Sequence, residues 1–94
     1  MERKKLSREE IEKGISKVSG WEAKDASLTK RFSFSNFAES LEFVNKAGEI
    51  AETADHHPDI TFGWGYAAFE ITTHDRGGIT VMDFDLAAKI DGIK

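Results

Sequence analysis

The stretch that decides the fold runs from residue 60 to residue 73 and reads Ile60-Thr61-Phe62-Gly63-Trp64-Gly65-Tyr66-Ala67-Ala68-Phe69-Glu70-Ile71-Thr72-Thr73. In each half, apolar residues at every second position alternate with neighbours that are mostly small or polar. This period of two is that of a strand with one buried face. Gly65-Tyr66 lies between the halves and predicts a tight turn. The stretch therefore predicts a β-hairpin.

Two further strands are expected upstream of this hairpin. Leu28, Phe32 and Phe34 occupy even positions among polar neighbours, which again indicates one buried face. Residues 21–23 are long enough for a short strand, and Asp25-Ala26 predicts the turn that joins it to the next one.

Three segments have the spacing of helices. Ser7-Arg8-Glu9-Glu10 has the pattern of a capping box, and the apolar stripe that follows predicts a helix ending near Ser19-Gly20. Ser35 or Asn36 is expected to cap a second helix that extends to about Thr53. Thr80 is expected to cap a third. The apolar residues that define the three stripes are Leu6, Ile11, Ile15 and Val18, then Phe37, Leu41, Val44, Gly48 and Ala51, then Met82, Leu86, Ala87 and Ile90.

The predicted order is therefore helix, two strands, helix, two strands, helix. This order favours an α+β fold with a four-stranded, mainly antiparallel sheet and its helices packed on one face. One sheet face then lacks a cover and the outer strands lack partners. Association into a homodimer or homotetramer would satisfy both, so we expect an oligomer.

Length and composition limit the possible functions. The chain has 94 residues, of which 39% are hydrophobic and 32% charged, so we expect one soluble globular domain over residues 1–94. The net charge of -4 argues against a broad nucleic-acid surface. With no cysteine there is no thiol chemistry or disulfide. No segment predicts a membrane span or signal peptide, so we expect a cytoplasmic protein without a membrane partner.

All three histidines fall near the ends of the predicted hairpin. His56 and His57 precede its first strand, with Pro58 after them, and His74 follows its second strand. Because the two ends of a hairpin lie side by side, His57 and His74 are expected to be close in space. Histidine is the side chain best suited to proton transfer near neutral pH. The ordinary alternative is a solvated turn with surface histidines.

Acidic residues accompany the histidines. Glu52 lies four residues before His56, so a continuous helix would place both on one face. Asp83 lies just beyond the His74 loop near the start of the third helix. The alternatives are that Glu52 is only solvated and that Asp83 only completes a cap with Thr80.

Other chemistries have weaker support. Three histidines and an acid could bind zinc, but adjacent residues in a strand point to opposite faces, so we expect no metal site. No phosphate-binding glycine loop and no serine nucleophile motif occurs. Trp64 is either a core residue or, if it reaches the open end of the hairpin, a platform for a flat ligand.

The spacing of Glu52, His56-His57-Pro58, His74 and Asp83 closely resembles the signature of the pterin-4a-carbinolamine dehydratase family. Further similarity runs from residue 6 to about residue 91, at Gly20-Trp21, at residues 32–37 and at residues 83–87. The chain differs from the common family pattern at Ile60, Trp64 and Met82, which bears on the substrate more than on the reaction type.

The resemblance implies a hydro-lyase that dehydrates 4a-hydroxytetrahydrobiopterin to quinonoid dihydropterin in tetrahydrobiopterin recycling. It implies His56 and His74 as acid–base groups at the hydroxyl and His57 as a contact that holds the pterin and shares in proton removal. Glu52 would then orient His56, and Asp83 would orient His74 or contact the ring.

Asp55, Pro58 and Trp64 are the remaining candidates for binding or orienting the substrate. No cofactor is expected, because the pterin is the substrate. The competing interpretation is a non-catalytic dimerisation or scaffold module for a protein partner.

Overall fold

The computed structural model describes residues 4–94. Helices and strands follow in the predicted order, with one additional short 3-10 helix, η1, before the last α-helix. Their bounds are α1 (Arg8–Ile15), β1 (Glu22–Lys24), β2 (Ser27–Ser33), α2 (Phe37–Ala54), β3 (Asp59–Gly63), β4 (Tyr66–Ile71), η1 (His74–Arg76) and α3 (Val81–Asp91).

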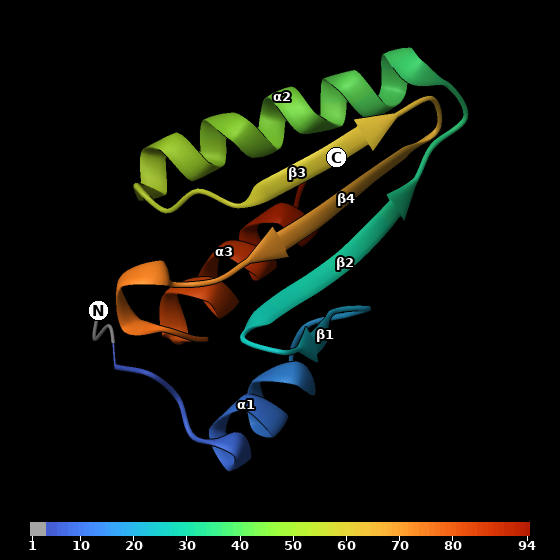
Figure 1. Ribbon diagram of the computed structural model, residues 1–94. Coiled ribbons are helices and arrows are strands. Elements are labelled where there is room, and N and C mark those ends of the chain that lie inside the picture. Colours follow the sequence, from blue (N-terminus) through green and yellow to red (C-terminus); the bar gives the residue numbers. More distant parts are fainter. Residues whose placement is uncertain (1–3) are drawn as a thin grey trace.

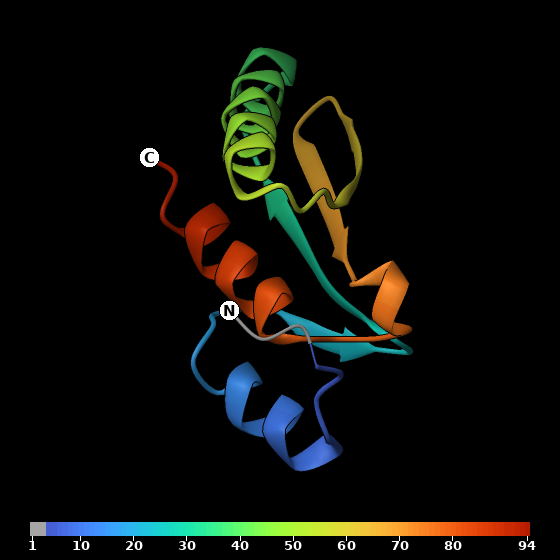
Figure 2. The ribbon, with the colours of Figure 1, turned by 90° about the vertical axis from the view of Figure 1, so that its left-hand side faces the viewer.

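The four strands form one antiparallel sheet in the order β1-β2-β4-β3 (Figure 1). Turned by 90°, the same ribbon shows the α-helices gathered on one side of the sheet (Figure 2). The predicted α+β class, strand arrangement and single covered face are therefore confirmed.

Strand register places the apolar residues on the covered face. Leu28 lies opposite Ile71, while Phe32 and Phe62 lie opposite Ala67, so large rings flank a small side chain. The buried core of the described residues consists of Trp21, Leu28, Ala47, Ala51, Ala67, Phe69, Ile71, Ile79, Leu86, Ala87 and Ile90. Apolar burial of this kind contributes about 25 cal/mol per Å² removed from water.

Side-chain caps explain where the α-helices begin. Ser7 accepts a hydrogen bond from the Glu10 N–H, and the Glu10 carboxylate accepts one from the Ser7 N–H at 2.9 Å. Of the two candidates for the second cap, Asn36 fills the position, with its side-chain oxygen 2.9 Å from the Glu39 N–H. Thr80 and Asp83 form the corresponding capping box at the start of α3.

Two predicted boundaries are wrong. The first helix ends at Ile15 rather than near Ser19-Gly20, because tighter bonds such as that from the Val18 N–H to the Ile15 carbonyl replace the helical pattern. The hairpin turn is formed by residues 64 and 65, not Gly65-Tyr66. Gly65 adopts φ of 81°, and Tyr66 already pairs with Gly63.

The opposite face of the sheet is polar. Thr29, Glu70 and Asp59 lie in one row across three strands. These residues line a shallow hollow of about 410 Å³ on this face. None of the described helices combines the length and apolar character needed to cross a bilayer.

Candidate active site

The end of α2 turns His56 into the protein. Asp55 adopts the left-handed conformation with φ of 53°, which stops the helix. The His56 N–H still donates to the Ala51 carbonyl at 3.1 Å. The His56 side chain is only 7% exposed, whereas His57 on the next residue is exposed. Pro58 follows directly and leads into β3.

A buried carboxylate fixes one side of the His56 ring. The His56 Nε2 lies 2.5 Å from Oδ1 of Asp83, which is fully buried at the start of α3. The other carboxylate oxygen, Oδ2, accepts from the Thr73 hydroxyl at 2.9 Å and from the Thr80 N–H at 2.8 Å. These donors compensate the desolvation of the carboxylate.

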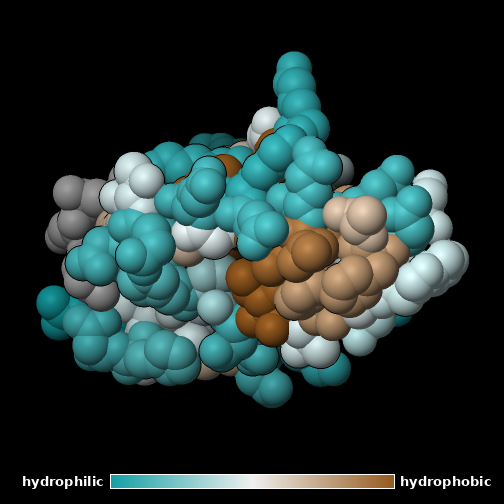
Figure 3. All heavy atoms as spheres, turned by 90° about the horizontal axis from the view of Figure 1, so that it is seen from above, coloured by the Kyte–Doolittle hydropathy of each residue, from teal (hydrophilic) through white to brown (hydrophobic). Residues whose placement is uncertain are grey.

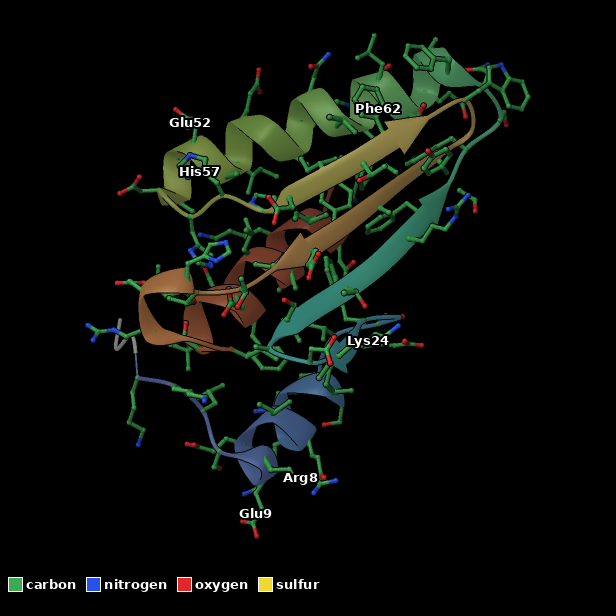
Figure 4. All side chains as sticks on the ribbon, viewed as in Figure 1. Arg8, Glu9, Lys24, Glu52, His57 and Phe62 are labelled. Carbon is green, nitrogen blue, oxygen red and sulfur yellow. The ribbon has the colours of Figure 1, made fainter. Side chains whose placement is uncertain are left out.

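The predicted pairings of Glu52 with His56 and of Asp83 with His74 are wrong, while a contact of Asp83 with the pterin ring stays a prediction. Glu52 pairs with Nε2 of His57 and not with His56. Figure 4 shows the Glu52 and His57 side chains close to each other at the end of α2. The reason is the left-handed turn at Asp55, which breaks the helical spacing of four residues. Asp83 holds His56 rather than His74.

The Glu52–His57 pair differs from the buried pair in its surroundings. The side chains of Glu52 and His57 are 77% and 54% exposed, so water screens their interaction. The predicted alternative of a solvated Glu52 therefore describes its exposure, although the carboxylate does have a partner.

The three histidines share one hollow at the open end of the β3–β4 hairpin. Its volume is about 270 Å³. The hollow is lined by Asp55, His56, His57, Thr72, Thr73, His74 and Asp75. The juxtaposition predicted from the hairpin is thus confirmed, while the catalytic roles of these residues stay predictions.

His74 reaches the hollow from η1. The preceding residue, Thr73, is buried and pairs with Gly78 in an isolated bridge. His74 itself is exposed, so the two neighbours point in different directions.

Trp64 lies at the other end of the hairpin. It is 71% exposed in the turn between β3 and β4, whereas the histidines flank the strand ends that are farthest from this turn. Neither interpretation of Trp64 is therefore correct: it is not a core residue, and it does not line the histidine hollow.

Sequence reasoning missed two members of the site. Thr73 was expected only as a strand residue and Thr80 only as a cap, but both hydroxyls belong to the buried network around Asp83. The signal that could have placed Thr80 in the site was the Thr80-x-x-Asp83 spacing. This spacing puts the carboxylate at the start of α3, and the open end of the hairpin lies at the same place.

Larger hollows elsewhere offer less chemistry. One of about 650 Å³ lies between α2 and α3 and is lined by residues that include Lys46, Ile50 and Lys89. It is larger than the hollow with the histidines, but no histidine lines it. Among residues 4–94, no three side chains of the His, Cys, Asp and Glu types are arranged to share a metal ion, so the zinc interpretation gains no support.

Comparisons with known proteins identify the family of this chain. The family model described as pterin 4 alpha carbinolamine dehydratase matches residues 4–93. A protein of Rubrobacter xylanophilus, provisionally named a pterin-4-alpha-carbinolamine dehydratase, is 48% identical over 87 residues, covering 92% of this chain and 81% of the relative. One of Sulfolobus acidocaldarius with the same name is 42% identical over 90 residues, covering 96% and 99%.

Two solved structures are also similar. The crystal structure of a transcriptional coactivator/pterin dehydratase from Brucella melitensis matches with a TM-score of 0.88 and 27% identity, covering 93% of this chain and 95% of that one. A pterin dehydratase-like protein identified as a RuBisCO assembly factor in the alpha-carboxysome matches with a TM-score of 0.63 and 25% identity, covering 76% and 82%. The chain therefore belongs to the pterin 4 alpha carbinolamine dehydratase family, a family of hydro-lyases.

Proposed function

We propose that this protein dehydrates 4a-hydroxytetrahydrobiopterin to quinonoid dihydropterin by histidine acid–base catalysis. The observation that carries the proposal is the hollow in which three imidazoles meet, one of them backed by a buried carboxylate. Family membership supports the reaction class. We also propose that the reaction serves tetrahydrobiopterin recycling in the cytoplasm.

The reaction requires two proton movements and no net oxidation. The C4a–O bond breaks, and the leaving hydroxyl takes a proton to become water. N5 loses its proton, and the electrons of that N–H bond form the C4a=N5 double bond. A positioned acid or base typically contributes about 10²–10⁴-fold to each such step.

His56 suits one of these proton transfers. Its Nε2 lies against the Asp83 carboxylate, which accepts hydrogen bonds only, so the proton of the neutral ring belongs on Nε2. Nδ1 is then the basic nitrogen that can take or return a proton. The adjacent carboxylate stabilises the imidazolium that forms, as in other carboxylate–histidine pairs.

His74 and His57 complete the set. We assign the second proton transfer at the hydroxyl to His74, which enters the hollow from η1. We assign His57 mainly to holding the pterin, with Glu52 orienting its ring and a share in removing the N5 proton. We assign Asp55 and Pro58 to shaping the turn in which the His56 side chain points inward and the His57 side chain points outward.

The proposed mechanism uses no metal and no cofactor besides the pterin. We also propose that the protein acts as a homodimer or homotetramer, because one sheet face and both outer strands lack a partner within the described chain.

Single substitutions test the acid–base roles. His56→Ala and His74→Ala should each lower the turnover of 4a-hydroxytetrahydrobiopterin by about 10²–10⁴-fold, measured by stopped-flow absorbance. A loss of less than about threefold in both variants would remove the acid–base assignment, because that is far below the contribution of a positioned proton donor.

A scaffold role is the second candidate. One structural relative is a RuBisCO assembly factor, and the first half of α2 carries an apolar patch (Figure 3). Phe37 and Leu41 are 43% and 39% exposed there, and Phe37 stacks on Phe62. A purified protein that fails to dehydrate the pterin, but whose assembly mass changes in Leu41→Lys, would favour this role.

A further inference from the structure

Thr73 connects the segment that carries His74 with the buried pair of His56 and Asp83. It lies between β4 and η1, and its side chain is only 1% exposed. Its N–H donates to the Gly78 carbonyl at 3.1 Å, which fixes the backbone directly before His74. Its hydroxyl donates to Asp83, and Asp83 is the residue that holds His56.

The hydrogen bonds around this hydroxyl have one consistent direction. The Thr73 hydroxyl has a single proton, and the Asp83 carboxylate, 2.9 Å away, can only accept it. The contact of 2.9 Å between the Thr73 and Thr80 hydroxyls must then use the proton of Thr80. The Thr80 oxygen in turn accepts from the Met82 N–H at 3.1 Å. The Thr80 hydroxyl therefore donates to Thr73, and the Thr73 hydroxyl donates to Oδ2 of Asp83.

The direction of these hydrogen bonds determines which oxygen of Asp83 accepts from His56. With the Thr73 hydroxyl and the Thr80 N–H both donating to Oδ2, the carboxylate has Oδ1 left to accept from the His56 ring. The ring must then carry its proton on Nε2 and leave Nδ1 as the basic nitrogen.

We propose that Thr73 is a positioning residue that holds Asp83 in place and so fixes the orientation of the His56 ring. The inference rests on the proposed function for its effect on turnover, but not for its effect on the His56 ring. Thr73→Val keeps the shape of the side chain and removes the donor. Asp83 then loses one of three hydrogen bonds, and the Thr80 hydroxyl loses its acceptor.

The test combines nitrogen NMR of the histidine rings with steady-state kinetics. In the unsubstituted protein, His56 should show a protonated Nε2 and an unprotonated Nδ1 above the pH at which imidazole becomes neutral. Thr73→Val should keep the proton on Nε2, because Asp83 is still a carboxylate, but this proton should exchange faster with water as the pair loosens. The same variant should lower kcat about tenfold with little change in KM, as expected for the loss of a hydrogen bond to a charged group.

Two control variants separate the hydroxyl from other effects. Thr73→Ser keeps the donor and should retain the slow exchange of the Nε2 proton and most of kcat. Thr53→Val also removes one threonine hydrogen bond, that to the Glu49 carbonyl, but on the exposed side of α2. It should leave both measurements unchanged.

Specific outcomes would overturn the inference. An Nδ1 proton on His56 in the unsubstituted protein would do so even if Thr73→Val failed to fold. So would a folded Thr73→Val with unchanged exchange of the Nε2 proton and unchanged kcat, or a Thr73→Ser as impaired as Thr73→Val. Absence of pterin dehydration by the unsubstituted protein would instead refute the proposed function, while the exchange of the His56 Nε2 proton would still decide the role of Thr73.

Discussion

Replacing Asp83 with asparagine should reverse the tautomer of His56 while preserving the shape of the site. Two donors, the Thr73 hydroxyl and the Thr80 N–H, face Oδ2 of Asp83. An asparagine must therefore turn its carbonyl oxygen toward them and its NH₂ group toward His56. The His56 Nε2 then accepts a hydrogen bond, and the ring proton moves to Nδ1, the nitrogen proposed to exchange protons with the substrate.

The size of the effect follows from what is lost. The ring of His56 can no longer act as a base at Nδ1, and the charge that stabilised its imidazolium form is gone. Removing a general acid–base contribution of about 10²–10⁴-fold raises the activation free energy by about 2.7–5.4 kcal/mol, at about 1.36 kcal/mol per factor of ten. Folding should be affected less, because the amide can satisfy the same three neighbours.

Stopped-flow dehydration of 4a-hydroxytetrahydrobiopterin measures this loss directly. Asp85→Asn is the matched control, because Asp85 lies on the same helix but its side chain is 36% exposed and pairs with Lys89 at 3.0 Å. It should keep normal kcat. An Asp83→Asn protein that retained kcat, with NMR showing the proton on Nδ1, would refute the idea that the His56 tautomer governs the reaction.

Further predictions concern the scaffold around the site. Gly14→Ala should destabilise the protein by about 1–3 kcal/mol in urea unfolding, because its Cβ would lie 2.5 Å from the Phe84 ring. Gly48→Ala, with no heavy atom within 4 Å, should stabilise the monomer by about 0.5–1 kcal/mol. Trp64→Ala should leave turnover within about twofold, since a side chain in the hairpin turn does not line the hollow; a larger loss measured in the same assay would contradict this placement. The hydrogen bond from the Ser7 N–H lowers the pKa of Glu10 below 4.5. The free energy of unfolding should therefore exceed that of Glu10→Gln by a constant amount above pH 4.5, and this difference should disappear as the pH falls through the lowered pKa.

Local pattern was sufficient to predict most of the fold. The alternation in β3 and β4 defines the buried face of the sheet directly, because a register error of one residue would expose Phe69 and Ile71. Asn36 and Thr80 mark helix starts through short-range bonds that the sequence records at fixed spacing. The end of α1 was not predictable in this way, because its stripe continues to Val18 after the helical bonds stop at Ile15.

The site was only partly predictable. A hairpin necessarily brings its two open ends together, so the meeting of His57 with His74 followed from topology alone. The partners of the carboxylates depended on the turn after α2. A helix that continued through Asp55 would have placed Glu52 near His56; the left-handed residue instead sends His56 inward and His57 outward. A positive φ at an aspartate leaves only a weak signal in a single sequence.

The two histidine–carboxylate pairs have the same chemical groups but different physical properties. In the pair of His56 and Asp83, the side chains are 7% and 0% exposed, so the interaction is poorly screened and its geometry is held by the core. The pair of His57 and Glu52 lies in water, where the attraction is weak and both side chains can reorient. A group that transfers a proton needs a fixed tautomer and direction, whereas a group that holds a flat ligand benefits from adjusting to it. This contrast is the physical reason for assigning proton transfer to His56 and binding mainly to His57.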